Sequence, residues 1–129
     1  MDKKKAKEIL IVHSDFISGN QNGYLNVLKQ KNIVNDAMFT DIMDAIQTLS
    51  DECYYKMVDG EIVKSIYAII FWCRSWLSDG AMLDKKMTLE DKVKLLKYTQ
   101  IIEEAFYYLL NGEKEEAFWI YNEYLDGRY

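Results

Sequence analysis

His13 is the only histidine of the chain, and it stands beside Ser14 and Asp15. A histidine can act as a general base, but the members of a Ser-His-Asp triad come from separate segments that meet in space. One histidine excludes a histidine-rich metal site, and Cys53 and Cys73 lack the paired spacing of a zinc site. We therefore predict no catalytic residue of this kind, no metal site and no cofactor.

Carboxylates are the next residues that could do chemistry. Residues 36–61 contain seven acidic residues and one basic residue. Asp41 with Asp44, or Glu103 with Glu104, could pair as acid and base or bind a hard cation. Catalytic carboxylates need surroundings that perturb their pKa, and we expect these four on solvent-facing helix surfaces. An acidic surface can instead attract a basic partner, because complementary charges speed encounter and set specificity.

Aromatic residues are unusually frequent, with ten Tyr and three Trp. Adjacent residues of a helix point about 100° apart, so pairs such as Tyr54 and Tyr55 cannot both face inward. Exposed Tyr and Trp are enriched in the energetic centres of protein interfaces. We predict that acidic and aromatic residues bind a partner protein: Asp41, Asp44, Asp51, Glu52, Tyr55, Tyr107, Trp119 and Tyr124.

The elements that carry these residues are predicted to be helices, and the most apolar segment runs from Ile62 to Leu77. A membrane-spanning helix needs about 20 largely apolar residues, whereas this segment is shorter and contains Lys64 and Arg74. It is hydrophobic on nearly every side, which is typical of a helix inside a bundle. We predict an all-α fold of five or six helices around a buried central helix, residues 62–77, without a membrane span.

One amphipathic helix is predicted before the central helix in the sequence, and another is predicted after it. Asn35 is a favourable N-cap for a helix that continues to about Val58, because apolar residues recur at spacings of three and four. Thr88, followed three residues later by Asp91, is similar to a capping box. The helix that it begins is expected to end at about Leu110.

The N-terminal fifteen residues allow two interpretations. The run Ile-Leu-Ile-Val could form a short buried strand, but no later strand with a crossover helix is available to pair with it. An amphipathic helix with Ile9, Val12 and Phe16 on one side is the interpretation that we favour, although the sequence leaves both open. Residues 19–23, Gly-Asn-Gln-Asn-Gly, predict a loop, and a short helix is expected after it.

The last quarter of the chain predicts an antiparallel helical hairpin. Ala105 and Ala117 are small residues where two helices would approach, Tyr108 and Tyr121 would fill the space between them, and Gly112 lies at the turn. This pattern resembles one tetratricopeptide-type hairpin, although the tryptophan and proline of that motif are missing. Because such solenoids need at least three units, the resemblance implies an antiparallel helix pair and not membership of that peptide-binding family.

Composition bounds the class of protein. The chain has 129 residues, half of them hydrophobic, and a formal net charge of −5. This length predicts a single domain, residues 1–129, that can bury a core without disulfides or metal. The mild negative charge argues against direct binding to nucleic acid, which needs a concentrated basic face. No apolar signal-peptide region follows the basic N-terminus, so we expect a cytoplasmic protein.

These observations predict a small helical protein that binds another protein stoichiometrically, one with a basic or mixed surface. An inhibitor, an immunity protein, an antitoxin or a small regulator of phage or bacterial-competition origin would fit, and a homo-oligomer is compatible. Two alternatives stay open. An acidic DNA mimic would space its carboxylates like phosphates and bind with steep salt dependence. A small helical enzyme would build its site from Tyr, Asp and Glu.

Overall fold

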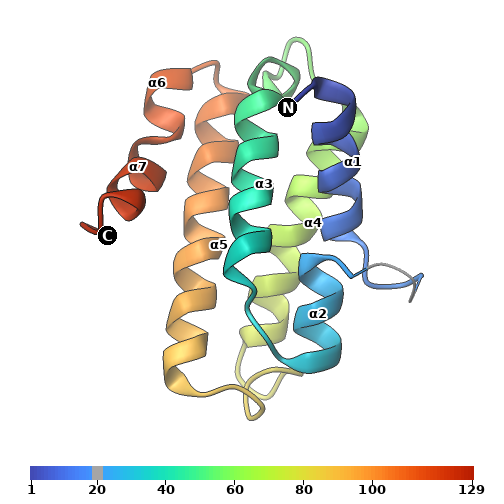
Figure 1. Cartoon of the computed structure of the whole chain (residues 1–129), viewed down its shortest axis with the longest axis vertical. Coiled ribbons are helices and arrows are strands. Elements are labelled where there is room, and N and C mark those ends of the chain that lie inside the picture. Colours follow the sequence, from blue (N-terminus) through green and yellow to red (C-terminus); the bar gives the residue numbers. More distant parts are fainter. Residues whose placement is uncertain (19–21) are drawn as a thin grey trace.

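The computed structural model describes residues 1–18 and 22–129, and within them the chain is helical and has no strand (Figure 1). The all-α class predicted from the sequence is confirmed. Most of the loop predicted at residues 19–23 lies outside the described residues. In chain order the elements are α1 (Lys3–Ser14), α2 (Tyr24–Lys31), α3 (Asp36–Thr48), the 3₁₀-helix η1 (Ser50–Cys53), α4 (Gly60–Leu77), α5 (Leu89–Leu110), α6 (Lys114–Ala117) and α7 (Trp119–Leu125).

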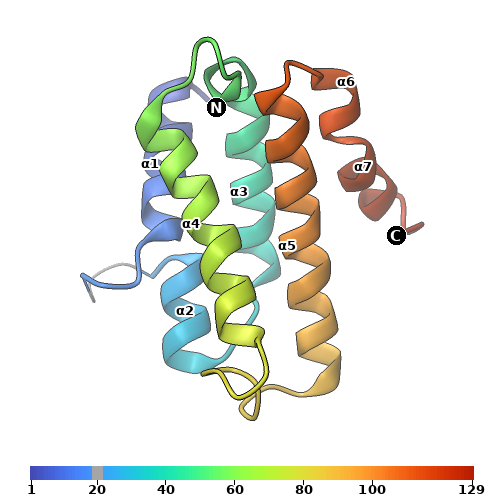
Figure 2. The ribbon, with the colours of Figure 1, turned by 180° about the vertical axis from the view of Figure 1, so that it is seen from behind.

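Four helices form the body of the fold. α1, α3, α4 and α5 lie side by side along the long axis, and the views from both sides agree on this arrangement (Figure 1, Figure 2). α1 packs against α3 and α4, α4 packs against α5, and α2 packs against the lower part of α1. α6 and α7 return along the outer side of α5 (Figure 1), so the predicted antiparallel C-terminal pair is present.

Side-chain caps fix where the main helices begin. Asp2, Asn35, Asp59 and Thr88 each accept a hydrogen bond from a backbone amide in the first turn of α1, α3, α4 and α5. Such a cap satisfies an amide that has no partner inside the helix, and its loss typically costs about 1 kcal/mol. The caps predicted at Asn35 and Thr88 are confirmed.

The core lies between these helices and is built mainly from aliphatic residues. Phe39 of α3 stacks on Tyr98 of α5, with ring centroids 3.8 Å apart and planes tilted by 4°. Apolar residues at spacings of three and four turn one stripe of each helix inward, as the sequence pattern indicated. Fully buried residues include Ala6, Leu10, Leu25, Ile42, Ile46, Ile66, Ile69, Leu95 and Ile102.

The apolar segment at residues 62–77 forms a helix as predicted, but neighbouring helices do not enclose it. Trp76 is only 7% exposed, whereas Tyr67 is 50% and Phe71 45% exposed. Lys64 lies on the same outward face. The spacing of Lys64, Tyr67 and Phe71 marks one helix face, so α4 is amphipathic with an aromatic outer face and is not a rod buried on all sides.

The predicted helix that begins after Asn35 ends ten residues earlier than expected, at Thr48. Leu49 caps it, η1 follows, and the backbone amide of Tyr55 donates a hydrogen bond of 3.1 Å to the Leu110 carbonyl. The chain therefore turns to pack on the end of α5. Local periodicity cannot reveal this tertiary contact, because apolar residues of a turn can fall by chance at helical spacing.

The two ends of the chain differ from the predictions in detail. The N-terminal segment is a helix, and its most buried residues are Ala6, Leu10 and His13, while Ile9 and Val12 are half-buried. The C-terminal helix is interrupted at Phe118, which separates the four residues of α6 from α7.

Candidate functional site

A hollow of about 370 Å³ opens between α5 and the α6–α7 pair. We call it the Trp119 hollow. Trp119 is 62% exposed at its edge. An indole in this position offers a large, rigid apolar surface, which is the kind of group that carries binding energy in protein interfaces. The lining residues are Glu104, Tyr108, Glu115, Glu116, Trp119 and Ile120.

Local sequence spacing places these residues around the hollow. Glu104 and Tyr108 are one turn apart on α5 and therefore face the same side. Ala117 is buried, which lets the short helix α6 approach α5 closely. The interruption at Phe118 redirects the chain, so Trp119 begins α7 at the edge of the hollow.

The Trp119 hollow is electrostatically negative. Within residues 1–18 and 22–129, none of Glu104, Glu115 and Glu116 forms an ion pair. Burial, and then the charge of Glu103, raises the pKa of Glu104 above its ordinary value. A cation placed here would relieve that repulsion and could lie on an aromatic face. Lysine and arginine side chains combine a cation with an apolar stem.

The acids predicted to bind a partner fall into two groups. Asp51 and Glu52 lie in η1, where Lys114 forms an ion pair with Asp51, and the Lys3 ammonium lies 2.8 Å from a Glu52 carboxylate oxygen. Their charges are partly compensated inside the chain. A partner would have to compete with these lysines, so this acidic pair is less available than the sequence suggested.

Asp41 and Asp44 form the second group, on the outer face of α3. Both are exposed. Asp41 Oδ2 lies 3.9 Å from Nε2 of His13. The charge of Asp44 contributes, after burial, to a raised pKa of Tyr121. These two acids are accessible, and their role in binding a partner stays a prediction.

The predicted aromatic residues are placed unequally. Tyr107 is 60% exposed on α5, and Tyr55 is exposed with the Lys56 ammonium 5.7 Å from its ring centroid. Tyr124 differs, because it is half-buried and packs against Tyr98 with ring centroids 5.6 Å apart. It belongs to a structural cluster, so the structure gives no support to Tyr124 as a direct contact with a partner.

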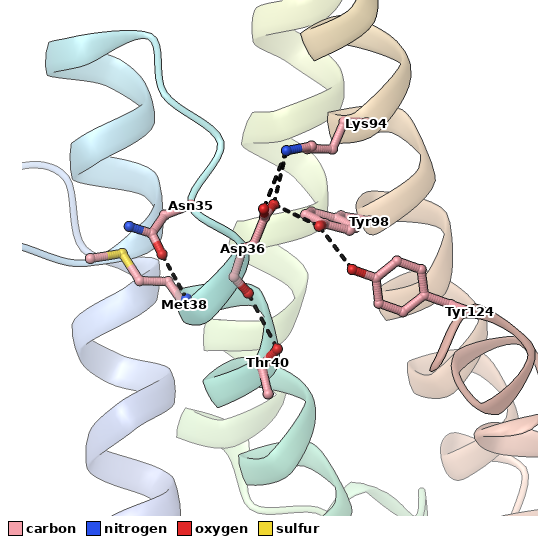
Figure 3. Close-up of polar contacts among 7 residues, drawn as sticks. All are labelled: Asn35, Asp36, Met38, Thr40, Lys94, Tyr98 and Tyr124. Atoms are coloured by element: carbon pink, nitrogen blue, oxygen red, sulfur yellow. Dashed lines mark hydrogen bonds and ion pairs between the residues drawn. The ribbon is translucent and has the colours of Figure 1, made fainter. Parts of the chain in front are cut away.

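That cluster joins α3, α5 and α7 (Figure 3). The Tyr98 hydroxyl donates a hydrogen bond of 2.7 Å to Oδ1 of Asp36, and it lies 3.0 Å from the Tyr124 hydroxyl. The Lys94 ammonium lies 3.1 Å from the same Asp36 oxygen. Asp36 also occupies the first turn of α3, where the helix dipole favours a negative charge. The cluster ties α7 to the body of the fold.

The cluster is the nearest arrangement in the described residues to a Tyr/Asp enzyme site, but its electrostatics are unsuitable. Burial, followed by hydrogen bonding to Tyr124 and Asp36, raises the pKa of Tyr98. The Tyr98 hydroxyl lowers the pKa of Asp36. Acid–base catalysis needs groups whose pKa lies near the working pH, whereas these shifts move both groups away from neutrality.

Sequence reasoning missed the Trp119 hollow as a unit. It selected Trp119 and considered Glu104 only as part of an acidic pair. The spacing of four residues between Glu115 and Trp119, and of three between Glu116 and Trp119, could have indicated a shared helix face. The interruption at Phe118, which bends that face around α5, has no clear sequence signal.

No family model matches the chain, and searches of curated proteins and of solved structures found no match. In the described part of the chain, no group of three or more His, Cys, Asp or Glu residues could hold a metal ion. None of the described helices combines the length and apolarity needed to cross a bilayer.

Proposed function

We propose that the protein acts by stoichiometric binding to another protein that presents a basic surface, in the manner of an inhibitor, an immunity protein, an antitoxin or a small regulator. The observation that carries this proposal is the Trp119 hollow, where an exposed indole stands beside three carboxylates without an ion pair in the described residues. A lysine or arginine of the partner would enter the hollow, with its cation near Glu104, Glu115 or Glu116 and its stem against Trp119.

The energetics of this arrangement favour recognition. A cation over an exposed aromatic ring is worth about 0.5–1 kcal/mol, and more once water is excluded. Because Glu104, Glu115 and Glu116 form no ion pair within the described residues, a partner's cation would not have to displace one from these carboxylates. The exposed acids of α3, Asp41 and Asp44, would add negative charge that speeds encounter with a basic partner, and Tyr107 would add exposed aromatic surface.

Affinity purification from the native host, followed by binding measurements with the purified partner, tests the proposal. We expect one partner molecule per chain, and we expect Trp119→Ala to weaken binding at least tenfold, as for an interface hot spot. Leu125→Ala is the matched control, because Leu125 is similarly exposed on the same helix but does not line the hollow. The double change Glu104→Gln and Glu116→Gln should weaken binding and reduce its salt dependence.

Equal affinities of wild type and Trp119→Ala for a confirmed partner would remove the hollow from the proposal. A partner with an acidic binding surface, or binding that strengthens with salt, would contradict the electrostatic part.

A further inference from the structure

One wall of the Trp119 hollow is a short helix with little attachment to the body of the fold. α6 packs on α5 through the buried Ala117, but the helix breaks at Phe118, whose φ of −111° and ψ of 14° lie outside the α-helical range. α7 follows with seven residues, of which only Tyr121 is buried. A segment with so little buried surface opens at a lower free energy than the four-helix body.

Two tyrosines, one turn apart on α7, make its ring contacts with the body. Tyr121 and Tyr124 each meet Phe39 of α3 edge-on, with ring centroids 5.9 Å and 5.7 Å apart. Tyr124 also meets Tyr98 of α5 edge-on. Ile120, which lines the hollow, lies four residues before Tyr124 and therefore on the same side of α7. The attachment of α7 and its contribution to the hollow share one helix face.

A directed hydrogen bond completes this attachment (Figure 3). The Tyr98 hydroxyl has one hydrogen, and it donates that hydrogen to the carboxylate of Asp36, which pairs with Lys94 and can only accept. The Tyr124 hydroxyl, 3.0 Å away, must therefore donate its own hydrogen to the Tyr98 oxygen. α7 stands at the end of a chain of hydrogen bonds that begins at a charge on α3, and such chains strengthen their members.

We propose that Tyr98 and Tyr124 are positioning residues of the Trp119 hollow: their hydrogen bond holds α7 docked on the body, and α7 turns about Phe118 when that bond opens. Tyr124 lies six residues beyond Phe118, about 9 Å along the helix axis, so the bond acts at the far end of α7. Trp119 directly follows the break, so the direction of its indole follows the orientation of α7. The hollow is complete only while α7 is docked.

This inference rests on the proposed function, because the hollow is the surface assigned there to the partner. A partner that recognises only docked α7 meets an apparent affinity reduced by the docked fraction. Partner binding in turn shifts the population towards the docked state. Tyr124 therefore acts on binding through Trp119, without touching the partner.

NMR of the full chain without any partner tests the positioning role. The indole N–H signal of Trp119 is identified by its loss in Trp119→Phe. Loss of one hydroxyl hydrogen bond shifts an equilibrium by about two- to tenfold, so Tyr98→Phe and Tyr124→Phe should each raise the released population by that factor. Their Trp119 signals should then fall on one line with that of wild type, from the docked towards the released position. Tyr67→Phe is the matched control, because Tyr67 is half exposed on α4, away from α7 and the hollow.

Two further variants test whether the hydroxyls act as one pair. Tyr98→Phe and Tyr124→Phe together should release α7 no further than either change alone, because both remove the same bond. Tyr124→Ala, which also removes the ring contacts, should move the Trp119 signal furthest along the same line while circular dichroism shows the four-helix body intact. A Trp119 signal that Tyr124→Phe leaves in place, or fully additive effects of the two hydroxyl losses, would overturn the proposal.

Binding measurements separate this inference from the proposed function. Tyr124→Ala should weaken binding of a confirmed partner roughly tenfold or more, because only the docked fraction binds. If the Trp119 signal moves as expected but Trp119→Ala leaves partner binding unchanged, the positioning of α7 stands and the role of the hollow in binding fails. If Trp119→Ala abolishes binding but the Trp119 signal stays fixed in every tyrosine variant, the positioning role alone fails.

Discussion

The Nδ1 atom of His13 accepts a hydrogen bond of 3.0 Å from the backbone amide of Tyr24, the first residue of α2. Gly23, the N-cap of that helix, offers no side chain for this purpose. A side chain of α1 therefore satisfies an amide at the start of α2, in a buried position. His13 also faces Asp41 of α3, so one imidazole of α1 contacts two further helices, α2 and α3.

This hydrogen bond predicts a dependence of stability on pH. Burial lowers the pKa of His13 below 6.5, and the charge of Asp41 only partly opposes the shift. The unfolded chain therefore binds a proton more readily than the folded chain. The contribution of His13 is fully present above the unfolded pKa of about 6.5 and is lost as the pH falls through the lower folded value. Denaturant unfolding between pH 5 and 8 should show this loss.

His13→Gln provides the comparison for that experiment, because an amide oxygen can accept a hydrogen bond and does not titrate. We expect its stability to vary less with pH near 6 than that of wild type. His13→Ala should lose about 1–2 kcal/mol at pH 8, the typical cost of a removed cap and an unsatisfied amide. Parallel pH profiles for wild type and His13→Gln would contradict the assignment.

The close approach of α1 and α2 at Gly23 predicts that a larger residue there would destabilise the fold. A Cβ at Gly23 would lie 2.2 Å from the carbonyl oxygen of Val12, so the backbones of α1 and α2 would have to separate. Gly23→Ala should therefore destabilise the fold by several kcal/mol, as expected for overpacking against backbone. Gly60→Ala is the matched control, because a Cβ there meets nothing within 4 Å. At the start of α4 it should be neutral or stabilising by up to about 1 kcal/mol. Thermal unfolding of both variants measures the difference.

These examples show which features of the fold could be read from the sequence. α5 was predicted closely at both ends, because Thr88 caps it and its apolar period is regular. The hydrogen bond between His13 and Tyr24 spans 11 residues of sequence and depends on the close approach of two helices. No local pattern encodes that approach, so the histidine could be assessed for catalysis but not placed as a cap.

The surface was predicted less completely for a similar reason. Exposure of Tyr107 and Trp119 follows from their adjacency to inward-facing residues. The charge of Asp51 is compensated by Lys114, and that of Glu52 by Lys3. Both lysines are far from these acids in the sequence. Tertiary contacts of this kind decide which charges remain available to a partner.

Removal of the hydroxyl group should have opposite effects on stability at Tyr98 and at Tyr24. Tyr98→Phe keeps the stacking on Phe39 but removes the hydrogen bond to Asp36, and it should cost about 1–2 kcal/mol. Tyr24→Phe removes a buried hydroxyl that has no hydrogen-bond partner in the described residues, so stability should be unchanged or higher. Chemical denaturation of both variants provides the test.

The Asp36 carboxyl gives an independent measurement for the same pair. The Tyr98 hydroxyl is the main cause of the lowered Asp36 pKa, so Tyr98→Phe should raise that pKa towards its ordinary value. NMR titration of the carboxyl carbon would follow the change. Tyr24→Phe should alter the Asp36 pKa much less, since Tyr24 donates no hydrogen bond to it. An unshifted Asp36 in Tyr98→Phe would show that the hydrogen bond contributes little in solution.

The thiols of Cys53 and Cys73 are expected to be alkylated slowly in the folded protein. Burial raises the pKa of both Cys53 and Cys73 to about 12. The thiolate is the reactive form, so at pH 8 it is a very small fraction of either residue and reagents have no direct access. We expect native Cys53 and Cys73 to react with iodoacetamide slowly, through transient openings of the fold and in proportion to the population of the open form, and both to react rapidly in guanidinium. Cys53 lies in η1, outside the main helices, where opening needs less of the core to separate than at Cys73 in α4. Mass spectrometry should therefore detect modification of Cys53 before Cys73, and the reverse order would show that α4 opens more readily than η1.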